Sequence, residues 1–228
     1  MGSSPNQNQE EPVATQAPPS LAPSLQKTEE EVVEGRLQAA VVKSVTRQKF
    51  EAENKNMATR TRTLLKVSAS ALPSHLTAST LSGPSRISVP PIVLIDETAG
   101  SLLAFYHLGP QLSGHVGLVH GGFLAVLLDE CMGRACFGRL PERIGVTVNL
   151  SMNYKKPVRV DSVVAVRAVT DRIDGRKAWV QASIILIEED EEGKGIENSH
   201  IEEEKDVAVE ATALFIQPRW AASMEPVV

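Results

Sequence analysis

The stretch from His120 to Phe137 contains residue types whose spacing suits chemistry at a carbonyl group. Gly121 and Gly122 have no Cβ, so a ligand can approach the backbone closely, and the first N–H groups of a helix lack partners within it. Such donors, at the positive end of the helix dipole, can hold a developing negative charge. Asp129 follows seven residues after Gly122 and could serve as a base or a nucleophile.

Two turns of helix separate Asp129 from these glycines. The carboxylate lies on the same side as the N–H donors but about 10 Å along the helix axis. One active site in one chain cannot easily use both groups, whereas a second copy packed antiparallel could bring Asp129 of one chain to Gly121 of the other. The neighbouring Glu130 lies about 100° further around the helix, so the two acids cannot face one substrate.

The element that positions these groups is a helix that should be buried. Phe123 to Leu128 are apolar at every position, which is typical of a helix with no solvent-facing side. Asp129, Glu130 and Arg134 interrupt the apolar run, so the stretch does not fit a membrane span of about 20 apolar residues. Burial favours the protonated form of a carboxyl group and makes it a better base, but Asp129 could instead be paired structurally with Arg134 or with another chain.

Strand-like segments lie on both sides of this helix. Five or six strands are expected from alternating hydrophobicity or β-branched content, within 87–95, 102–108, 144–154, 162–173, 176–187 and 207–217. Asp174-Gly175 indicates a two-residue hairpin turn, and the Pro90-Pro91 pair limits the first strand to an edge or a bulge. Strands grouped around one long helix indicate an α+β fold with a mainly antiparallel sheet wrapped around it.

The combination of His-Gly-Gly at 120–122 with Asp129 resembles the hotdog-fold acyl-CoA thioesterases of the phenylacetyl-CoA and long-chain acyl-CoA type. Residues 146–157, which end in Asn-Tyr and a Lys-Lys-Pro corner, are similar to the strand that follows the helix in that family. The resemblance covers about Leu76 to Arg219. It implies a hotdog fold and hydrolysis of an acyl-CoA substrate by a homodimer or homotetramer with sites across the interface. No cofactor is implied, because coenzyme A is part of the substrate.

The resemblance also implies roles for individual residues. Asp129 would be the base or nucleophile, and the Gly121 N–H would polarise the thioester oxygen. His120 would position this loop or donate beside it, and Thr147 aligns with a Ser or Thr that orients water in similar enzymes. Without the resemblance, His120 is a capping or packing histidine and Thr147 an ordinary β-former. The expected substrate-binding residues are Gly122, His115, Lys155, Lys156 and Arg159.

The three basic residues in that set would bind the CoA phosphates, although basic side chains at a strand end are often simply solvated. The loop before the helix departs from part of the family, because several relatives have an Asn where this sequence has Gly114. His115 beside it could substitute or be a surface histidine. A non-catalytic hotdog module that binds acyl-CoA or a protein is therefore the alternative to an enzyme. Tyr106 and Trp179 could line an acyl tunnel or belong to the core.

The rest of the chain consists of extensions. A capping box at Thr28 to Glu31 opens an amphipathic helix expected from Thr28 to Glu53. The expected divisions are a Pro/Ser/Gln-rich disordered tail at 1–26, a helical extension at 27–75, the hotdog domain at 76–219 with an acidic hairpin insertion at 188–206, and a tail at 220–228.

The composition of the sequence argues against some classes of partner and indicates a cellular compartment. The net charge of −5 without a basic stripe argues against a nucleic-acid partner, and neither a transmembrane segment nor metal-ligand spacing is found in the sequence. Cys131 and Cys136, five residues apart on the helix, cannot bridge each other and are expected to be core residues of a protein in a reducing compartment. We expect a cytoplasmic protein; the alternative is mitochondrial, because residues 58–86 contain basic residues and no acid and would resemble a transit peptide if translation began at Met57.

Overall fold

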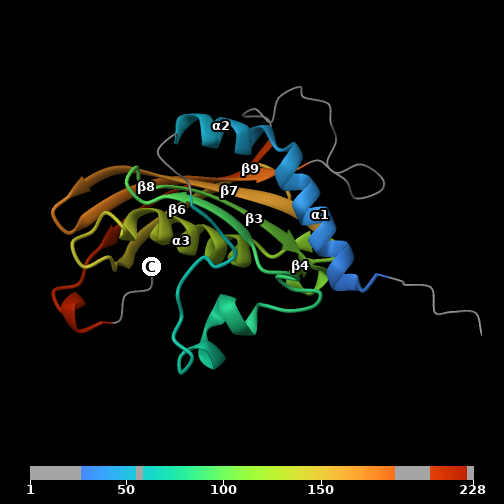
Figure 1. The fold of residues 1–228 in the computed structure, drawn as a ribbon, viewed down its shortest axis with the longest axis horizontal. Coiled ribbons are helices and arrows are strands. Elements are labelled where there is room, and N and C mark those ends of the chain that lie inside the picture. The colour runs from blue at the N-terminus through green and yellow to red at the C-terminus, as the bar shows by residue number, and fades with distance from the viewer. Residues whose placement is uncertain (1–26, 55–58, 188–205, 225–228) are drawn as a thin grey trace, which may run out of the picture.

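The computed structural model describes residues 27–54, 59–187 and 206–224, and these form three layers (Figure 1). Two helices cover part of one face of a large sheet, and a third helix packs against the other face. The helices are α1 (Glu29–Lys43), α2 (Val45–Glu53) and α3 (Gly121–Phe137). The strands of the large sheet are β1 (Thr59–Thr61), β2 (Ile92–Asp96), β3 (Ser101–Leu108), β6 (Val146–Tyr154), β7 (Ser162–Asp174), β8 (Lys177–Leu186) and β9 (Val207–Ile216).

The large sheet is antiparallel throughout, in the order β1-β2-β3-β7-β8-β9-β6. The predicted α+β hotdog arrangement, one long buried helix wrapped by an antiparallel sheet, is confirmed. Six strands lie where the sequence predicts them, and the three-residue β1 is an additional one. The remaining short elements are β4 (Ser113–His115), β5 (Leu118–Val119), η1 (Leu72–Ser74), η2 (Leu76–Thr80), η3 (Pro110–Leu112) and η5 (Ala221–Ser223).

Helix α3 is buried because its apolar residues leave almost no face for water. Leu127, Leu128 and Met132 are completely buried in the core that α3 shares with β3, β7, β8 and β9. Cys131 and Cys136 are free, buried thiols, and burial raises the pKa of each to about 12. The interpretation of both cysteines as core residues is therefore confirmed, since a thiol so resistant to ionisation is a poor nucleophile.

The opposite face of the sheet is partly covered by α1 and α2, which share a second core with it. Thr28 forms the predicted capping box with Glu31 at the start of α1. The prediction of a single helix from Thr28 to Glu53 is wrong, because the helix is interrupted at Ser44. Ser44 has an extended conformation (φ −63°, ψ 121°), and its side chain accepts a hydrogen bond from the Arg47 N–H, so it ends α1 and caps α2.

Turns at the strand ends follow the sequence signals. Gly175, in the predicted hairpin between β7 and β8, has a φ of 55°, a left-handed value that glycine adopts readily. Pro90 and Pro91 precede β2 instead of lying within it. The tail at 1–26 and all of the acidic insertion except Asp206 lie outside the described residues. Within the described ranges, none of the helices combines the length and apolar character needed to cross a bilayer.

We expect Leu128→Ala to lower the free energy of unfolding by about 2–5 kcal/mol, because it leaves a cavity between α3 and the sheet. Val42→Ala is a suitable control, since Val42 on α1 is 62% exposed and its loss should change stability by less than about 0.5 kcal/mol. Denaturant unfolding followed by circular dichroism measures both. Equal midpoints for the two variants would contradict the burial of α3.

Candidate active site

Asp129 and Thr147 come together between α3 and β6. The Thr147 hydroxyl donates a hydrogen bond of 2.7 Å to Oδ1 of Asp129. Thr147 lies at a β-bulge where the register between β6 and β9 shifts, and such bulges re-aim side chains. The structure therefore joins the predicted acid to the predicted polar residue on the following strand. Asp129 is only partly buried in the single chain, unlike the buried carboxylate expected, because it faces the exposed strand β6.

The alternative that Asp129 pairs structurally with Arg134 is wrong within this chain. Arg134 instead donates to Glu97 at 2.8 Å, and Arg143 donates to the other oxygen of Glu97 at 2.6 Å. The hydrogen bonds from these two guanidinium groups lower the pKa of Glu97. The Arg134 guanidinium thus links α3 to the turn that follows β2.

The start of α3 has the form expected of a site for negative charge. His120 is the N-cap, and its Nδ1 accepts a hydrogen bond of 2.9 Å from the Gly122 N–H, so the capping interpretation of His120 is confirmed. Among the described residues, the Gly121 N–H has no acceptor. Tyr154 at the end of β6 donates to the Gly121 carbonyl at 2.8 Å. The N–H predicted to bind an oxyanion is therefore available, while that of Gly122 is occupied.

The loop before α3 packs so closely on His120 that it leaves no room for a side chain at Gly114. A Cβ at Gly114 would lie 2.9 Å from the Cα and from a ring carbon of His120, which is closer than real Cβ contacts. The neighbouring His115 is exposed on β4. Substrate contact by His115 stays a prediction, and the tight packing at Gly114 fixes the histidine that caps α3.

The basic residues predicted to bind phosphate are exposed beyond β6, but two have acidic partners. Lys155 forms an ion pair with Glu210, and the Lys156 ammonium lies 3.8 Å from Asp206. In the described part of the chain, the exposed Arg159 side chain has no ion pair. Arg159 is therefore the member of this set most open to an anionic ligand.

The central part of the chain is similar in sequence to known enzymes. Residues 116–192 match the model of the thioesterase superfamily. The resemblance to thioesterases is thereby confirmed for the stretch that contains α3, Asp129 and Thr147. We call residues 116–192 the thioesterase region.

Two curated relatives each match about half of this chain. An uncharacterised mitochondrial protein of Candida albicans is 36% identical over 107 residues, covering 47% of this chain and 48% of the relative. The acyl-coenzyme A thioesterase THEM4 of Mus musculus is 34% identical over 115 residues, covering 50% of this chain and 42% of the relative. This chain therefore spans about half, or less, of the length of either relative.

Among solved structures, a phenylacetic acid degradation-related protein of Ralstonia eutropha is 20% identical, with a TM-score of 0.44. The match covers 56% of this chain and 84% of that protein.

A pocket of about 180 Å³ lies where the thioesterase region meets the segment that precedes β2. Its wall combines apolar side chains with Glu130, whose carboxylate accepts from the Thr77 hydroxyl at 2.7 Å. Burial raises the pKa of Glu130, and the bond from Thr77 only partly offsets this. Asp129 and Glu130 thus face different surroundings, as the helix geometry predicts. Sequence reasoning missed Thr77 because no motif links it to a residue 53 positions away.

The two aromatic residues considered for an acyl tunnel differ in position. Tyr106 is buried in the core, as one of the two interpretations predicts, and it also lines this pocket with Leu127 of α3. Trp179 does not belong to it; the Arg172 guanidinium lies 3.7 Å from the Trp179 ring centroid near the end of the β7–β8 hairpin.

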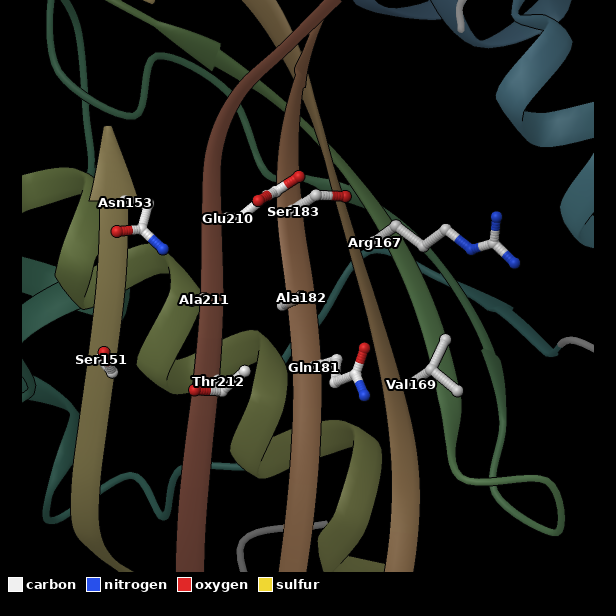
Figure 2. Close-up of a pocket in the computed structure, with 10 residues that line it drawn as sticks. All are labelled: Ser151, Asn153, Arg167, Val169, Gln181, Ala182, Ser183, Glu210, Ala211 and Thr212. Carbon is white, nitrogen blue, oxygen red and sulfur yellow. The ribbon is translucent and has the colours of Figure 1, made fainter. Parts of the chain in front are cut away.

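A larger hollow of about 440 Å³ lies on the sheet face that points away from α3 (Figure 2). Strands β6 to β9 carry its lining side chains toward the viewer, while α3 lies behind the sheet. The lining includes Arg167, Gln181 and Glu210, whereas Asp129 and Gly121 are not part of it. This hollow is therefore separate from the candidate catalytic groups Asp129 and Gly121.

The raised pKa of Glu130 predicts a pH-dependent stability. Ionisation of this side chain is unfavourable in the folded protein, so its contribution to stability is present below its ordinary pKa of 4.5 and is lost as the pH rises through the raised value. We expect Glu130→Gln, which keeps an acceptor for Thr77, to stabilise the protein at pH 7 and to lose this advantage toward pH 4.5. Denaturant unfolding across this pH range measures the difference, with exposed Asp171→Asn as the control. A Gln-minus-Glu difference independent of pH would contradict it.

Proposed function

We propose that the protein is an acyl-CoA thioesterase, which hydrolyses a thioester to a carboxylic acid and free CoA. The observation that carries the proposal is the Asp129–Thr147 hydrogen bond on a helix whose first N–H group has no acceptor among the described residues. The match to the thioesterase superfamily and the thioesterase named among the relatives support it. The whole protein's activity is part of the proposal, because the relatives are matched over half their length or less.

In the proposed reaction, Asp129 acts on water or on the substrate itself. As a base, its carboxylate takes a proton from water while the oxygen attacks the thioester carbon, and the proton passes to the departing CoA sulfur. As a nucleophile, its carboxylate attacks the thioester carbon and expels the CoA thiolate; water then hydrolyses the mixed anhydride, and a proton from that water neutralises the thiolate. In both routes the Gly121 N–H stabilises the oxyanion. Thr147 holds Oδ1 of Asp129, which leaves Oδ2 for the reacting group.

The proposed site needs two chains. Asp129 lies eight residues after Gly121, or about 12 Å along one helix, which is too far for both to act on one carbonyl. Strand β6 is the edge of the sheet, and its Val148 and Tyr154 side chains are each 55% exposed. An apolar edge strand is a ready surface for pairing with another chain. We therefore place the partner copy along β6, with its α3 antiparallel, so that each site combines Asp129 of one chain with Gly121 of the other.

We place the acyl group in the pocket beside Tyr106 and Leu127, and the Asp129 that acts on it would come from the partner copy, because Glu130 and not Asp129 of the same chain lines this pocket. Its mainly apolar lining suits a hydrophobic chain, and exposed Arg159 suits the CoA phosphates. We propose a mitochondrial location, which the name of the Candida albicans relative supports in preference to the cytoplasm.

A non-catalytic module that binds acyl-CoA is the second candidate. The absence of a polar side chain at Gly114, where several relatives have Asn, favours it. The tight contact between Gly114 and His120 favours the enzyme instead, because it fixes the histidine that caps α3 beside the Gly121 N–H.

We expect Asp129→Asn to lower the rate of CoA release by about 10²- to 10⁴-fold, because the amide can neither accept the water proton nor attack. The assay follows free thiol from short, medium, long and aromatic acyl-CoAs at equal oligomer mass. Asp171→Asn, an exposed acid on β7, should retain full activity. Undiminished turnover in the Asn variant would refute the assignment, and no release from any thioester by the wild type would favour the binding module.

Mixing two inactive variants tests whether the site is shared. Gly121→Pro removes the proposed oxyanion donor while keeping the helix start, because proline is favoured at the first helical position and His120 already has the extended conformation (φ −63°, ψ 126°) that precedes proline. Dimers that pair Gly121→Pro with Asp129→Asn contain one intact site if the site crosses the interface. Re-associating equal amounts should restore about a quarter of wild-type activity. No recovery, despite heterodimers seen by native mass spectrometry, would place the site within one chain.

A further inference from the structure

The His107 side chain of β3 lies on the sheet face opposite α3, between Ser88 and Asp161. Its side chain is 2% exposed, its Nδ1 lies 3.1 Å from Ser88 Oγ, and its Nε2 lies 3.1 Å from Asp161 Oδ1. Because a carboxylate only accepts, Nε2 donates to Asp161, and in the neutral form of the imidazole Nδ1 can accept the proton of the Ser88 hydroxyl, which also donates to the Arg86 carbonyl. The three side chains thus have the order of hydrogen bonds found in a nucleophile, base and orienting acid.

Asp161 is held in place by three hydrogen bonds to Arg36 and Leu108. Arg36 of α1 donates to Oδ1 at 2.9 Å and to the Asp161 carbonyl at 2.8 Å, and the Asp161 N–H donates to the Leu108 carbonyl at 2.6 Å. Asp161 has a φ of 56°, a conformation that a non-glycine residue keeps only where surrounding contacts impose it. These contacts fix the carboxylate that faces His107.

Ser88 opens onto a cavity, unlike the buried His107. The cavity measures about 350 Å³ and lies between the start of α1 and the loop before β2. Ser88 is partly buried, and its hydroxyl also lies 3.2 Å from the Arg86 carbonyl. A ligand in this cavity would contact Ser88, whose hydroxyl lies 3.1 Å from His107 Nδ1. This volume falls in the range of small-molecule sites.

We propose that Ser88, His107 and Asp161 form a second nucleophilic site, separate from Asp129, that cleaves small uncharged or cationic carboxylic esters. Ser88 Oγ attacks the ester carbon and its proton passes to His107 Nδ1. The alcohol leaves with that proton, and an acyl group remains on Ser88. Water, deprotonated by His107, then releases the carboxylic acid and restores the serine. Asp161 is a positioning residue, because it acts on the reaction only through His107.

The surroundings of the cavity set the ligand class. Glu29 and Glu30 at the start of α1 line it, so they repel anions such as CoA thioesters. Arg36 also sets the expected rate, since it shares the Asp161 oxygen that faces the imidazole and offsets part of the stabilisation of the imidazolium. We therefore expect slow turnover, for which a covalent probe is the most sensitive readout.

The test uses the full-length protein and an uncharged alkyl fluorophosphonate, with the adduct located by peptide mass spectrometry. We expect labelling of Ser88, no adduct at this position in Ser88→Ala, and at least a tenfold slower reaction in Asp161→Asn through its maximal rate constant and not through probe affinity. Ser82→Ala, which alters another serine of the same cavity, should label normally. Asp129→Asn should label normally, and Ser88→Ala should retain CoA release, which separates this proposal from the thioesterase.

Three results would overturn the proposal. They are the absence of an adduct on Ser88 in folded protein, an adduct that forms equally fast in Asp161→Asn, and loss of labelling only together with loss of the circular dichroism signal. The last result would mean that the three contacts serve only to attach α1 to the sheet. His107→Gln is a further check, because it keeps a polar group at the position but provides no base.

Discussion

The burial of α3 against the antiparallel sheet is the constraint on which the rest of the structure depends. The helix gives up solvent contact along nearly all of its length, so its polar groups can lie only at its N-terminus and along its margins. The Gly121 N–H lies at the N-terminus of α3, and Asp129 and Glu130 lie along its margins. The two α3 groups proposed for thioester chemistry, the Gly121 N–H and Asp129, are therefore groups that the buried helix could not place in the core.

Two adjacent acids on α3 illustrate how local surroundings divide their roles. Asp129 accepts from Thr147 beside an open strand edge, whereas Glu130 accepts from Thr77 inside a mainly apolar pocket, which raises its pKa. A rotation of about 100° between neighbouring residues produces this difference. The same chain thus has one carboxylate available for solvent or substrate and one whose pKa is raised by burial.

Much of this could be predicted from the sequence, because it depends on local patterns. The apolar run of α3, the alternation in the strands and the Asp174-Gly175 turn each specify an element within a short window. The break at Ser44 was missed because apolar residues recur regularly across it. The contacts of Thr77 with Glu130 and of His107 with Asp161 join residues more than 50 positions apart, and only the folded sheet brings them together. Thr147 was found through family resemblance and not through its residue type.

The core beneath α1 and α2 has a consequence for where an autonomous folding unit can begin. Leu37 and Phe50 are fully buried against Leu103, Phe105 and neighbouring residues on the sheet face opposite α3. A fragment that starts at residue 76, the predicted boundary of the hotdog domain, would leave those sheet residues in water as a continuous apolar surface prone to aggregation. Helices α1 and α2 therefore cover an apolar face of the sheet, and recombinant fragments of this protein should retain them.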